Sequence, residues 1–263
     1  MPGTPSALPV SVIITRLRAA GCVFAEDEAD LLISAARTPA ELAAMVDRRI
    51  VGLPLEHILG WAEFCGRRIA VDPGVFVPRR RTEFLVREAV ALCRPGAVVV
   101  DVCCGSGAVG AALLSAAPSV ELYATDIDPA AVRCARRNLA DGRGEVFEGD
   151  LVEPLPAALR GRVDILVANA PYVPTEAIER MPPEARIHEA RVALDGGGDG
   201  LDVQRRVAAA APFWLAPGGY LLVETSKRQA PHTADIFAGI GLTPRVEHSD
   251  ELDATVVIGT ANG

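Results

Sequence analysis

The chain has 263 residues, half of them hydrophobic and 5% aromatic, which excludes a disordered or low-complexity chain and suffices for one large domain and a smaller one. Its formal net charge of −8 argues against a protein that binds nucleic acid by neutralising phosphates. No apolar run approaches the length of a membrane span, and the Pro-rich start, Met1 to Val10, lacks the Lys or Arg of a secretory signal, so we expect a soluble, cytoplasmic protein.

The first part of the chain has apolar residues at helical spacing. Turn signals at Gly21 and at Thr38-Pro39 divide residues 10–50 into three short helices, and Thr38 is expected to cap the third. Residues 61–78 then change to the pattern of a short β-hairpin, and a helix follows from Thr82, its expected cap, to Leu92. The expected parts are a flexible N-terminus (1–9), a helical domain (10–60), a hairpin linker (61–80) and a large domain (81–263).

Beyond Ala97, strand and helix patterns alternate, which is typical of an α/β protein with a parallel, doubly wound sheet. The expected strands are 98–102, 120–125, 145–147, 163–168 and 219–224, and the expected helices are 109–116, 129–139 and 203–211. Two last strands, near 243–247 and 254–259, have little between them and should form an antiparallel pair. Residues 169–201 are too many for an ordinary connection, and such long loops usually carry function.

A glycine-rich turn follows the first strand of this pattern. Gly105, Ser106 and Gly107 begin a G-x-G-x-x-G sequence at the start of a helix, where glycine permits a tight turn and close approach to a ligand. Asp126 stands 21 residues after Gly105, at the end of the next strand, where a carboxylate can hold both hydroxyls of a ribose. On this motif alone, a nicotinamide dinucleotide fits as well as S-adenosyl-L-methionine (SAM).

The charge near the glycine turn favours one of the two cofactors. A dinucleotide places its pyrophosphate at the helix N-terminus, where the nearby Asp101 would repel it. SAM has no phosphate but carries an ammonium and a sulfonium, which acidic side chains attract. Asp101, Asp126 and Asp150, at the ends of three strands, therefore favour SAM, with Asp150 suited to accept a hydrogen bond from an adenine amino group. Asp128, before Pro129, is interpreted as a helix cap.

The fourth strand ends in Asn169-Ala170-Pro171-Tyr172, which resembles the Asn-Pro-Pro-Tyr signature of SAM-dependent methyltransferases that act on planar amino nitrogens. The Asn169 side-chain oxygen and the Ala170 carbonyl can accept hydrogen bonds from the two N–H groups of such a nitrogen, which directs its lone pair towards the methyl group. Tyr172 would wall the substrate amide, and Pro171 would stiffen the turn. No strong general base is required, which agrees with the absence of a recognisable His, Cys or Ser triad.

Two more segments extend the resemblance to nearly the whole chain. Residues 76–83, FVPRRRTE, resemble the F-V-P-R-P-x-T-E segment of the HemK/PrmC family of protein-glutamine N(5)-methyltransferases, and residues 188–201 resemble that family's E-P-x-x-A-L-x-G-G-x-D-G-L loop. The chain departs from these patterns at Arg80, Ala170 and Ala190, each of which replaces a proline.

The resemblance implies a class I SAM-dependent methyltransferase: a Rossmann-like, seven-stranded doubly wound sheet with an antiparallel terminal strand, preceded by a small helical domain that recognises the protein substrate and by a linking hairpin. It implies N(5)-methylation of a protein glutamine, above all the Gly-Gly-Gln glutamine of class 1 peptide chain release factors, with S-adenosyl-L-homocysteine as the product. The implied cofactor-binding residues are Asp101, Cys103, Gly105, Ser106, Gly107, Asp126, Ile127, Asp150, Leu151 and Asn169. The implied catalytic residues are Asn169, Ala170, Pro171 and Tyr172, and the implied substrate-binding residues are Phe76, Pro78, Arg79, Thr82 and Glu189.

Several alternatives stay open. An amino-methyltransferase of adenine or cytosine in nucleic acid shares the tetrapeptide, a paralogue could methylate another protein such as a ribosomal protein, and an NAD(P)-linked oxidoreductase shares the glycine turn. A degenerate fold that only binds a partner is supported by Ala170 alone. We expect a monomer without a metal site or direct nucleic-acid binding. The six cysteines are interpreted as small buried thiols in a reducing compartment, and the paired arginines, among them Arg48-Arg49, as a solvated surface.

Overall fold

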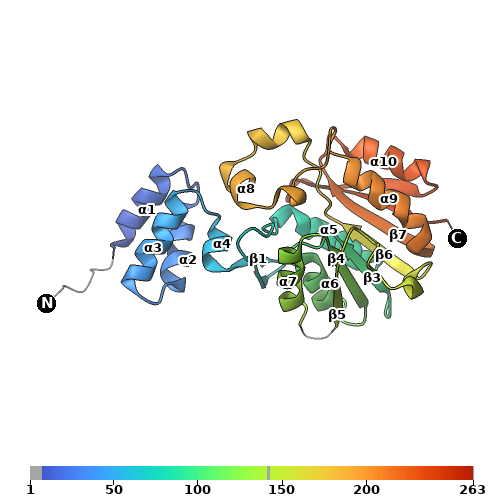
Figure 1. Cartoon of the computed structure of the whole chain (residues 1–263), viewed down its shortest axis with the longest axis horizontal. Helices are drawn as coiled ribbons and strands as arrows, with labels where there is room; N and C mark the ends of the chain where they lie inside the picture. Colours follow the sequence, from blue (N-terminus) through green and yellow to red (C-terminus); the bar gives the residue numbers. More distant parts are fainter. Residues whose placement is uncertain (1–7, 141–142, 263) are drawn as a thin grey trace.

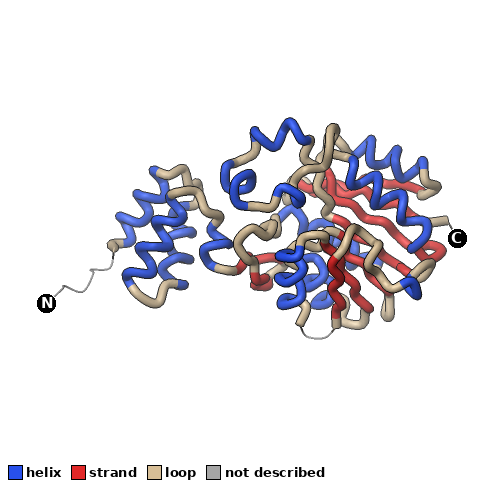
Figure 2. The backbone as a smooth tube through the Cα atoms, in the orientation of Figure 1, coloured by secondary structure: helices blue, strands red, loops and turns tan. Residues whose placement is uncertain are grey.

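The computed structural model describes residues 8–140 and 143–262, and it contains a small helical part and a larger part built on a β-sheet (Figures 1 and 2). The helical part comprises α1 (Val10–Ala19), α2 (Ala25–Ala35), α3 (Pro39–Ile50) and α4 (Leu55–Leu59). Ile13, Leu17 and Leu32 are fully buried in a cluster that belongs to these helices alone. The three expected helices are confirmed, whereas the short α4 was not expected.

Three residues were expected to cap helices, and two of these predictions are confirmed. The Thr38 hydroxyl accepts a hydrogen bond from the backbone N–H of Glu41, and the Asp128 carboxylate accepts one from Ala130. Both oxygens thereby satisfy free donors in a first helical turn. The third prediction is wrong: Thr82 has helical backbone angles and makes no capping hydrogen bond with its side chain, which is engaged in the site described below.

A hairpin connects the helical part to the sheet. Its strands β1 (Trp61–Phe64) and β2 (Arg67–Ala70) pair antiparallel, as expected, with Trp61 opposite Ala70. The turn between them consists of Cys65 and Gly66, which both have a positive φ. A short 3-10 turn, η1 (Arg80–Thr82), then leads into helix α5 (Glu83–Leu92).

The larger part contains the seven-stranded sheet that the sequence predicts. Its strands are β3 (Val98–Val102), β4 (Glu121–Asp126), β5 (Gly144–Glu148), β6 (Val163–Ala168), β7 (Leu215–Thr225), β8 (Thr243–Ser249) and β9 (Ala254–Thr260). They lie in the order β5-β4-β3-β6-β7-β9-β8. The first five strands in this order are parallel, and β9 runs antiparallel to both of its neighbours, β7 and β8. The last two strands thus form the expected antiparallel pair, with β9 inserted beside β7.

Helices cover both faces of this sheet (Figure 2). Helices α5 and α6 (Ala108–Ala116) pack on one face in a core that includes Leu85 and Leu113, with α7 (Pro129–Asn138) beside them. Helices α9 (Asp202–Trp214) and α10 (Ala230–Gly239) pack on the other face around residues such as Val207 and Phe237. Because these five strands run parallel, their carboxyl ends meet at one edge, where such sheets bind ligands.

The larger part also differs from the expected elements. Strand β7 begins at Leu215 instead of Gly219, and the helix α10 was not expected. The long connection after β6 contains two short 3-10 turns, η3 (Thr175–Arg180) and η4 (Arg191–Ala193), and between them helix α8 (Pro183–His188). Over the described residues, none of the helices is both long and apolar enough to cross a membrane.

Candidate active site

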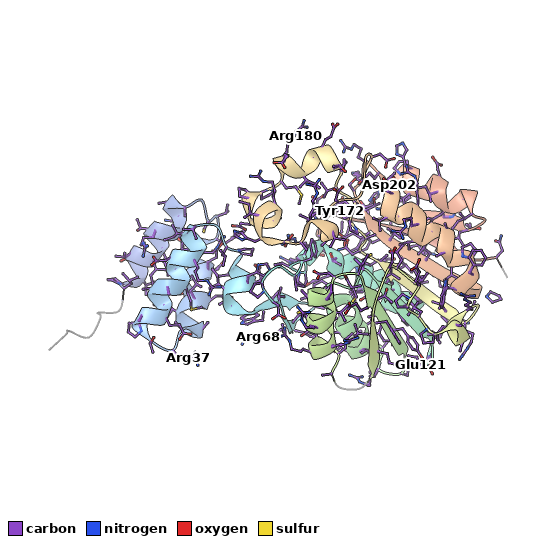
Figure 3. All side chains as sticks on the ribbon, in the orientation of Figure 1. Arg37, Arg68, Glu121, Tyr172, Arg180 and Asp202 are labelled. Atoms are coloured by element: carbon purple, nitrogen blue, oxygen red, sulfur yellow. The ribbon has the colours of Figure 1, made fainter. Side chains whose placement is uncertain are left out.

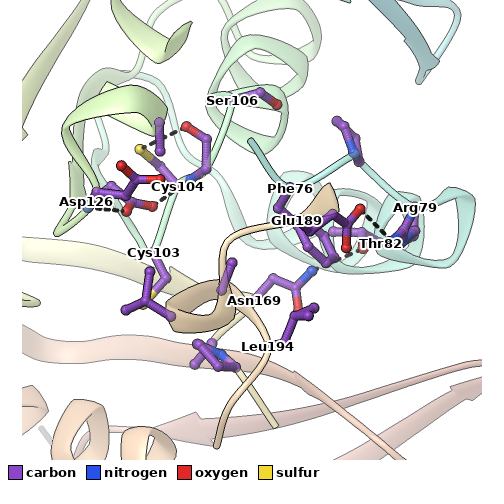
Figure 4. A pocket seen from close by; sticks show the side chains of 18 of the residues that line it. Phe76, Arg79, Thr82, Cys103, Cys104, Ser106, Asp126, Asn169, Glu189 and Leu194 are labelled. Carbon is purple, nitrogen blue, oxygen red and sulfur yellow. Dashed lines mark hydrogen bonds and ion pairs between the residues drawn. The ribbon is translucent and has the colours of Figure 1, made fainter. Parts of the chain in front are cut away.

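A cavity of about 550 Å³ opens at the carboxyl edge of β3, β4 and β6. Its wall comes from the segment between β2 and α5, the glycine turn, the loops after β4, β5 and β6, and helix α8. The predicted site residues that line it are Phe76, Pro78, Arg79, Thr82, Asp101, Cys103, Gly105, Ser106, Asp126, Ile127, Asp150, Leu151, Asn169, Ala170, Pro171, Tyr172 and Glu189. Gly107 is the one predicted site residue not in this lining. The structure therefore gathers residues from segments far apart in the sequence into a single cavity (Figure 4).

The glycine turn fixes the orientation of the Asp126 carboxylate. The N–H of Gly105 donates to Asp126 Oδ2 at 2.8 Å, and the N–H of Asp128 donates to Oδ1 at 2.9 Å. Each carboxylate oxygen keeps a lone pair for a further donor, as the two hydroxyls of a ribose would require. A Cβ added to Gly105 would meet no atom within 4 Å, so the backbone borders open space there.

Gly107 has a packing role instead. It has a φ of +76° immediately before α6, and an added Cβ would lie 3.0 Å from the Cβ of Ala135 on α7. Only glycine combines this backbone conformation with such close approach of two helices. Gly107 thus shapes the turn without facing the cavity.

Asp101 is the last residue but one of β3, whose bounds agree with the expected strand 98–102. It is 2% exposed, and its Oδ2 accepts a hydrogen bond from the N–H of Gly110 at 3.1 Å. The pKa of Asp101 is raised to about 7. Burial is the main cause and the nearby Asp126 adds to it, while the hydrogen bond from Gly110 acts in the opposite direction. Burial also raises the pKa of Asp126. A cation in the cavity would favour the ionised form of both carboxyls.

The Asp150 carboxylate is engaged in an ion pair. Its carboxylate pairs with the guanidinium of Arg206 on α9 at 2.6 Å, although the sequence analysis assigned it to a cofactor amino group. The next residue, Leu151, has a φ of +49° and packs partly buried against the sheet. Arg206 also lines the cavity, so an adenine at this end would meet an ion pair and not an isolated acid.

The cysteines of the glycine turn are thiols and not thiolates. Burial raises the pKa of both Cys103 and Cys104 well above the usual value for a thiol, and Asp101 and Asp126 add to the effect. Both residues line the cavity. All six cysteines of the chain are described and free. Cys22, Cys104 and Cys134 are buried, as expected, whereas the other three, Cys65, Cys93 and Cys103, are only partly buried.

Asn138, at the end of α7, holds the glycine turn against the hairpin. Its Oδ1 accepts a hydrogen bond from the N–H of Ala70 at 2.9 Å. Its Nδ2 donates to the carbonyls of Ala70 and Ser106, each at 2.8 Å. One amide side chain therefore satisfies three backbone groups and joins β2 to the cofactor half of the cavity.

The other half of the cavity contains Asn169, directly after β6. Its Nδ2 donates to the Thr82 hydroxyl oxygen at 3.2 Å, and Figure 4 shows the amide turned towards Thr82. Tyr172, labelled in Figure 3, is partly buried, and its hydroxyl donates to Glu224 Oε1 at 3.4 Å. Burial, together with Glu224, raises the pKa of Tyr172 to about 12. The Tyr172 ring therefore borders the site as a neutral phenol.

Glu189 anchors the long connection to the segment after the hairpin. Its Oε1 accepts hydrogen bonds from the N–H of Val77 at 3.1 Å and from the Arg79 guanidinium at 2.6 Å. Its Oε2 is buried and has no hydrogen-bond partner among the described residues. Burial raises the pKa of the Glu189 carboxyl, and Arg79 works against this. A buried oxygen without a partner, in a residue that lines the cavity, is suited to accept a donor from a ligand.

The sequence analysis missed Glu224, which is 2% exposed at the carboxyl end of β7. Its Oε1 also accepts a hydrogen bond from Arg81 Nε at 3.3 Å. The rule that picked out the strand-end aspartates could have found it, because the expected strand 219–224 ends on this residue. No local pattern indicates its partners, since these come from two distant loops.

The comparisons with known proteins identify the type of fold and its relatives. Residues 67–213 match the family model described as "Methyltransferase small domain". The release factor glutamine methyltransferase of Geobacter sulfurreducens is 42% identical over 77% of this chain and 72% of that protein. The 4-amino-L-phenylalanine/4-methylamino-L-phenylalanine methyltransferase of Streptomyces pristinaespiralis is 35% identical over 86% of this chain and 80% of that protein. The crystal structure of a methyltransferase from Pyrococcus furiosus, 15% identical, covers 84% of this chain and all of that one with a TM-score of 0.58, which shows the shared fold.

Proposed function

Because this chain belongs to the release factor glutamine methyltransferase family, we propose that it transfers a methyl group from SAM to the N(5) nitrogen of a glutamine in a class 1 peptide chain release factor. One observation carries the proposal. Asn169 Nδ2 donates a hydrogen bond to the Thr82 hydroxyl oxygen, so Asn169 Oδ1 can accept one from a ligand in the cavity. The glycine turn that would hold the methyl donor lines the same cavity. An acceptor at this position suits a substrate that presents N–H groups.

The residues of the cofactor half fit SAM. The Asp126 carboxylate, held by Gly105 and Asp128, is oriented for the ribose hydroxyls. The buried Asp101 would be stabilised in its ionised form by a cationic ligand, whereas the carboxylates of Asp101 and Asp126 would repel a pyrophosphate at the glycine turn. When bound, SAM supplies an electrophilic methyl group on a sulfonium. The roles of Cys103, Ile127 and Leu151 in the cofactor site remain predictions.

The substrate half would orient the glutamine amide. Asn169 Oδ1 and the Ala170 carbonyl would each accept one N–H of the amide, so that the nitrogen lone pair points towards the methyl group. The neutral Tyr172 ring would form one side of the amide site. The buried Ala170 and Pro171 would exclude water from the site. The nitrogen becomes acidic as the new N–C bond forms and then loses its proton, so a strong base is not needed.

The release factor would dock between the helical part and the long connection after β6. Residues of both parts, such as Glu56 and Ala185, line the mouth of the cavity beside Glu189. The division into a substrate-recognition domain (10–60), a linker (61–80) and a methyltransferase domain (81–263), the monomeric state and the cytoplasmic location remain predictions.

The test is methyl transfer from labelled SAM to a purified class 1 release factor, with mass mapping of the modified residue. We expect label on the glutamine of the Gly-Gly-Gln segment. Asn169→Ala should lower kcat by about 100-fold, as for loss of an oriented catalytic group. The matched control is Asn262→Ala, since Asn262 bonds only the Gly241 carbonyl near the end of the chain. Equal transfer by Asn169→Ala and the wild type would refute the mechanism.

A second candidate is methylation of an aromatic amine, because the Streptomyces pristinaespiralis relative is named as a methyltransferase of 4-amino-L-phenylalanine. The nitrogen of an aromatic amine is also planar and presents two N–H groups. The same assay with 4-amino-L-phenylalanine, with nucleic acid and with ribosomal proteins separates these readings. Transfer to one of them and none to release factors would replace the proposed substrate.

A further inference from the structure

Gln229, immediately before α10, is buried and does not line the cavity. Its Nε2 donates to two backbone carbonyls, that of Tyr172 at 3.0 Å and that of Asp199 at 3.1 Å. Its Oε1 accepts a hydrogen bond from the Ser226 hydroxyl at 2.6 Å. Because a carbonyl can only accept, the amide nitrogen must face the two carbonyls, and the orientation of the Gln229 amide is thereby fixed.

The two carbonyls belong to segments that pack on each other at the substrate half of the cavity. Tyr172 ends the tetrapeptide after β6, and Asp199 lies near the end of the long connection that follows it. Within the described part of the chain, the tetrapeptide carbonyl that accepts a hydrogen bond from a side chain is that of Tyr172. A single buried amide therefore joins the end of the tetrapeptide to the end of the long connection.

Two glycines of the long connection make room for this contact. A Cβ added to Gly200, which has a φ of +81°, would lie 2.4 Å from the Tyr172 carbonyl oxygen and 2.6 Å from Gln229 Nε2. A Cβ added to Gly196 would lie 2.7 Å from the Pro171 carbonyl oxygen. Glycine permits such close approach of two backbones. The long connection therefore packs directly on the tetrapeptide backbone, and Gln229 bonds to both.

Resting on the function proposed above, we infer that Gln229 is a positioning residue for methyl transfer: it holds the Tyr172 carbonyl and thereby the backbone of the tetrapeptide that orients the glutamine amide. Gln229 acts only through this backbone. A displacement of the tetrapeptide by about 1 Å is enough to slow a reaction between positioned groups by about 100-fold. Loss of the Gln229 hydrogen bonds should therefore lower kcat and leave the binding of both ligands largely intact.

The first test is Gln229→Glu, which keeps the shape of the side chain but replaces its donor. A carboxylate cannot donate to the two carbonyls and is repelled by them, so kcat for the release factor should fall by about 100-fold at about pH 8. The KM for the release factor and the thermal shift with SAM should stay close to wild type. Here kcat is expressed per folded molecule, with the folded fraction measured by circular dichroism.

The pH dependence of this variant separates positioning from structural support. A protonated carboxyl can donate one hydrogen bond, and burial raises the pKa of a carboxyl. The kcat of Gln229→Glu relative to wild type should therefore rise as the pH is lowered from about 8 to about 6. Gln229→Met removes the donor without adding a titratable group, so its kcat should be low at every pH. It also carries the test if Gln229→Glu does not fold.

The matched control is Gln204→Glu, which changes the other glutamine of the chain. Gln204 is fully buried and bonds the hydroxyls of Thr225 and Thr233, neither of which lines the cavity. This variant should lose stability but keep a kcat per folded molecule close to wild type, with no dependence on pH beyond that of the wild type.

Four results would overturn the inference while the proposed function stands. They are a wild-type kcat in Gln229→Met, a loss confined to KM, an equal loss of kcat in Gln204→Glu, and a kcat ratio of Gln229→Glu that does not change with pH. A wild-type protein that methylates no release factor would instead refute the proposed function, and this inference with it.

Discussion

The guanidinium of Arg49, at the end of α3, lies 2.6 Å from the carboxylate of Glu184 on α8, although 135 residues separate the two in the sequence. Arg49 is 6% exposed and also pairs with Glu28 on α2 at 2.5 Å. Its third partner is the Leu53 carbonyl at 3.1 Å. One buried cation therefore fastens the helical part to the segment that covers the cavity, and Figure 1 shows α8 between these two parts.

Replacing Arg49 by Met should destabilise the protein. The Glu28 side chain, 12% exposed, would lose its partner and remain as a buried charge. We expect the free energy of unfolding in urea to fall by about 3 kcal/mol. Arg37→Met is the control, because Arg37 is exposed (Figure 3) and its pair with Glu41 should contribute little to stability. Equal effects of the two changes would contradict the prediction.

Glu184→Gln should loosen the attachment of α8 to the helical part without unfolding the protein. Glu184 is 45% exposed and Arg49 keeps Glu28, so the loss in stability should stay below about 1 kcal/mol. Hydrogen exchange of the backbone amides of α8 should nevertheless become faster, because α8 loses its ion pair with α3. Unchanged exchange in α8 would show that other contacts hold this segment.

Asp101 should make the stability of the ligand-free protein depend on pH. Its pKa is about 7 in the folded protein, against about 3.9 in an unfolded chain, so the folded state binds the proton more tightly. The stabilising effect of that proton is fully present below about pH 4 and is lost as the pH rises to about 7. Asp101→Asn should therefore flatten the fall in unfolding free energy between pH 5 and pH 8, measured in urea. A fall as steep as that of the wild type would assign the effect to another carboxyl, such as Asp126.

The same residue should couple SAM binding to proton release. A cation beside Asp101 favours its carboxylate, so calorimetry near pH 7 in buffers of different ionisation enthalpy should detect protons released on binding. Asp101→Asn should release fewer protons and bind SAM about tenfold more weakly, the equivalent of one pKa unit of favourable interaction. Proton release equal to that of the wild type would exclude Asp101 as its source.

Ala170→Pro restores the proline of the family signature and should be tolerated. In the described structure the Ala170 amide donates no hydrogen bond and its φ is not positive, so a proline ring removes no interaction there. We expect the free energy of unfolding to rise by about 0.5 kcal/mol, because proline lowers the conformational entropy of the unfolded chain. The Ala170 carbonyl should also be held more firmly, so that kcat rises modestly. A marked loss of stability in thermal unfolding would show that the present backbone angle excludes proline.

The sequence predicted those features that depend on neighbouring residues. Three of these features are the glycine turn, the acids at the strand ends and the tetrapeptide at Asn169. Each can be found from its place next to a predicted strand, and the parallel sheet brings all three to one cavity. Helix α10 escaped prediction because its sequence has no marked amphipathic pattern, and burial of Phe237 against the sheet stabilises it. Arg49 was wrongly assigned to a solvated surface, since its carboxylate partners come from distant helices.

Several side-chain contacts around the cavity could not be predicted from local sequence patterns. Thr82 stands where a helix cap is expected, yet its hydroxyl serves Asn169, which is 87 residues away. The pairing of Asp150 with Arg206 depends on the packing of α9 beside the loop after β5. Such pairings depend on the three-dimensional arrangement and not on spacing, so only the folded chain reveals them.

The side chain of Asn138 has a mechanical consequence for the whole molecule. It clamps Ala70 of the hairpin and Ser106 of the glycine turn to the end of a single helix, through three hydrogen bonds of 2.9 Å or less. The hairpin is thereby tied to the glycine turn, and at its other end it follows directly after α4 of the helical part. A change in the position of the glycine turn would therefore have to be accommodated at the hairpin, which connects the sheet to the helical part.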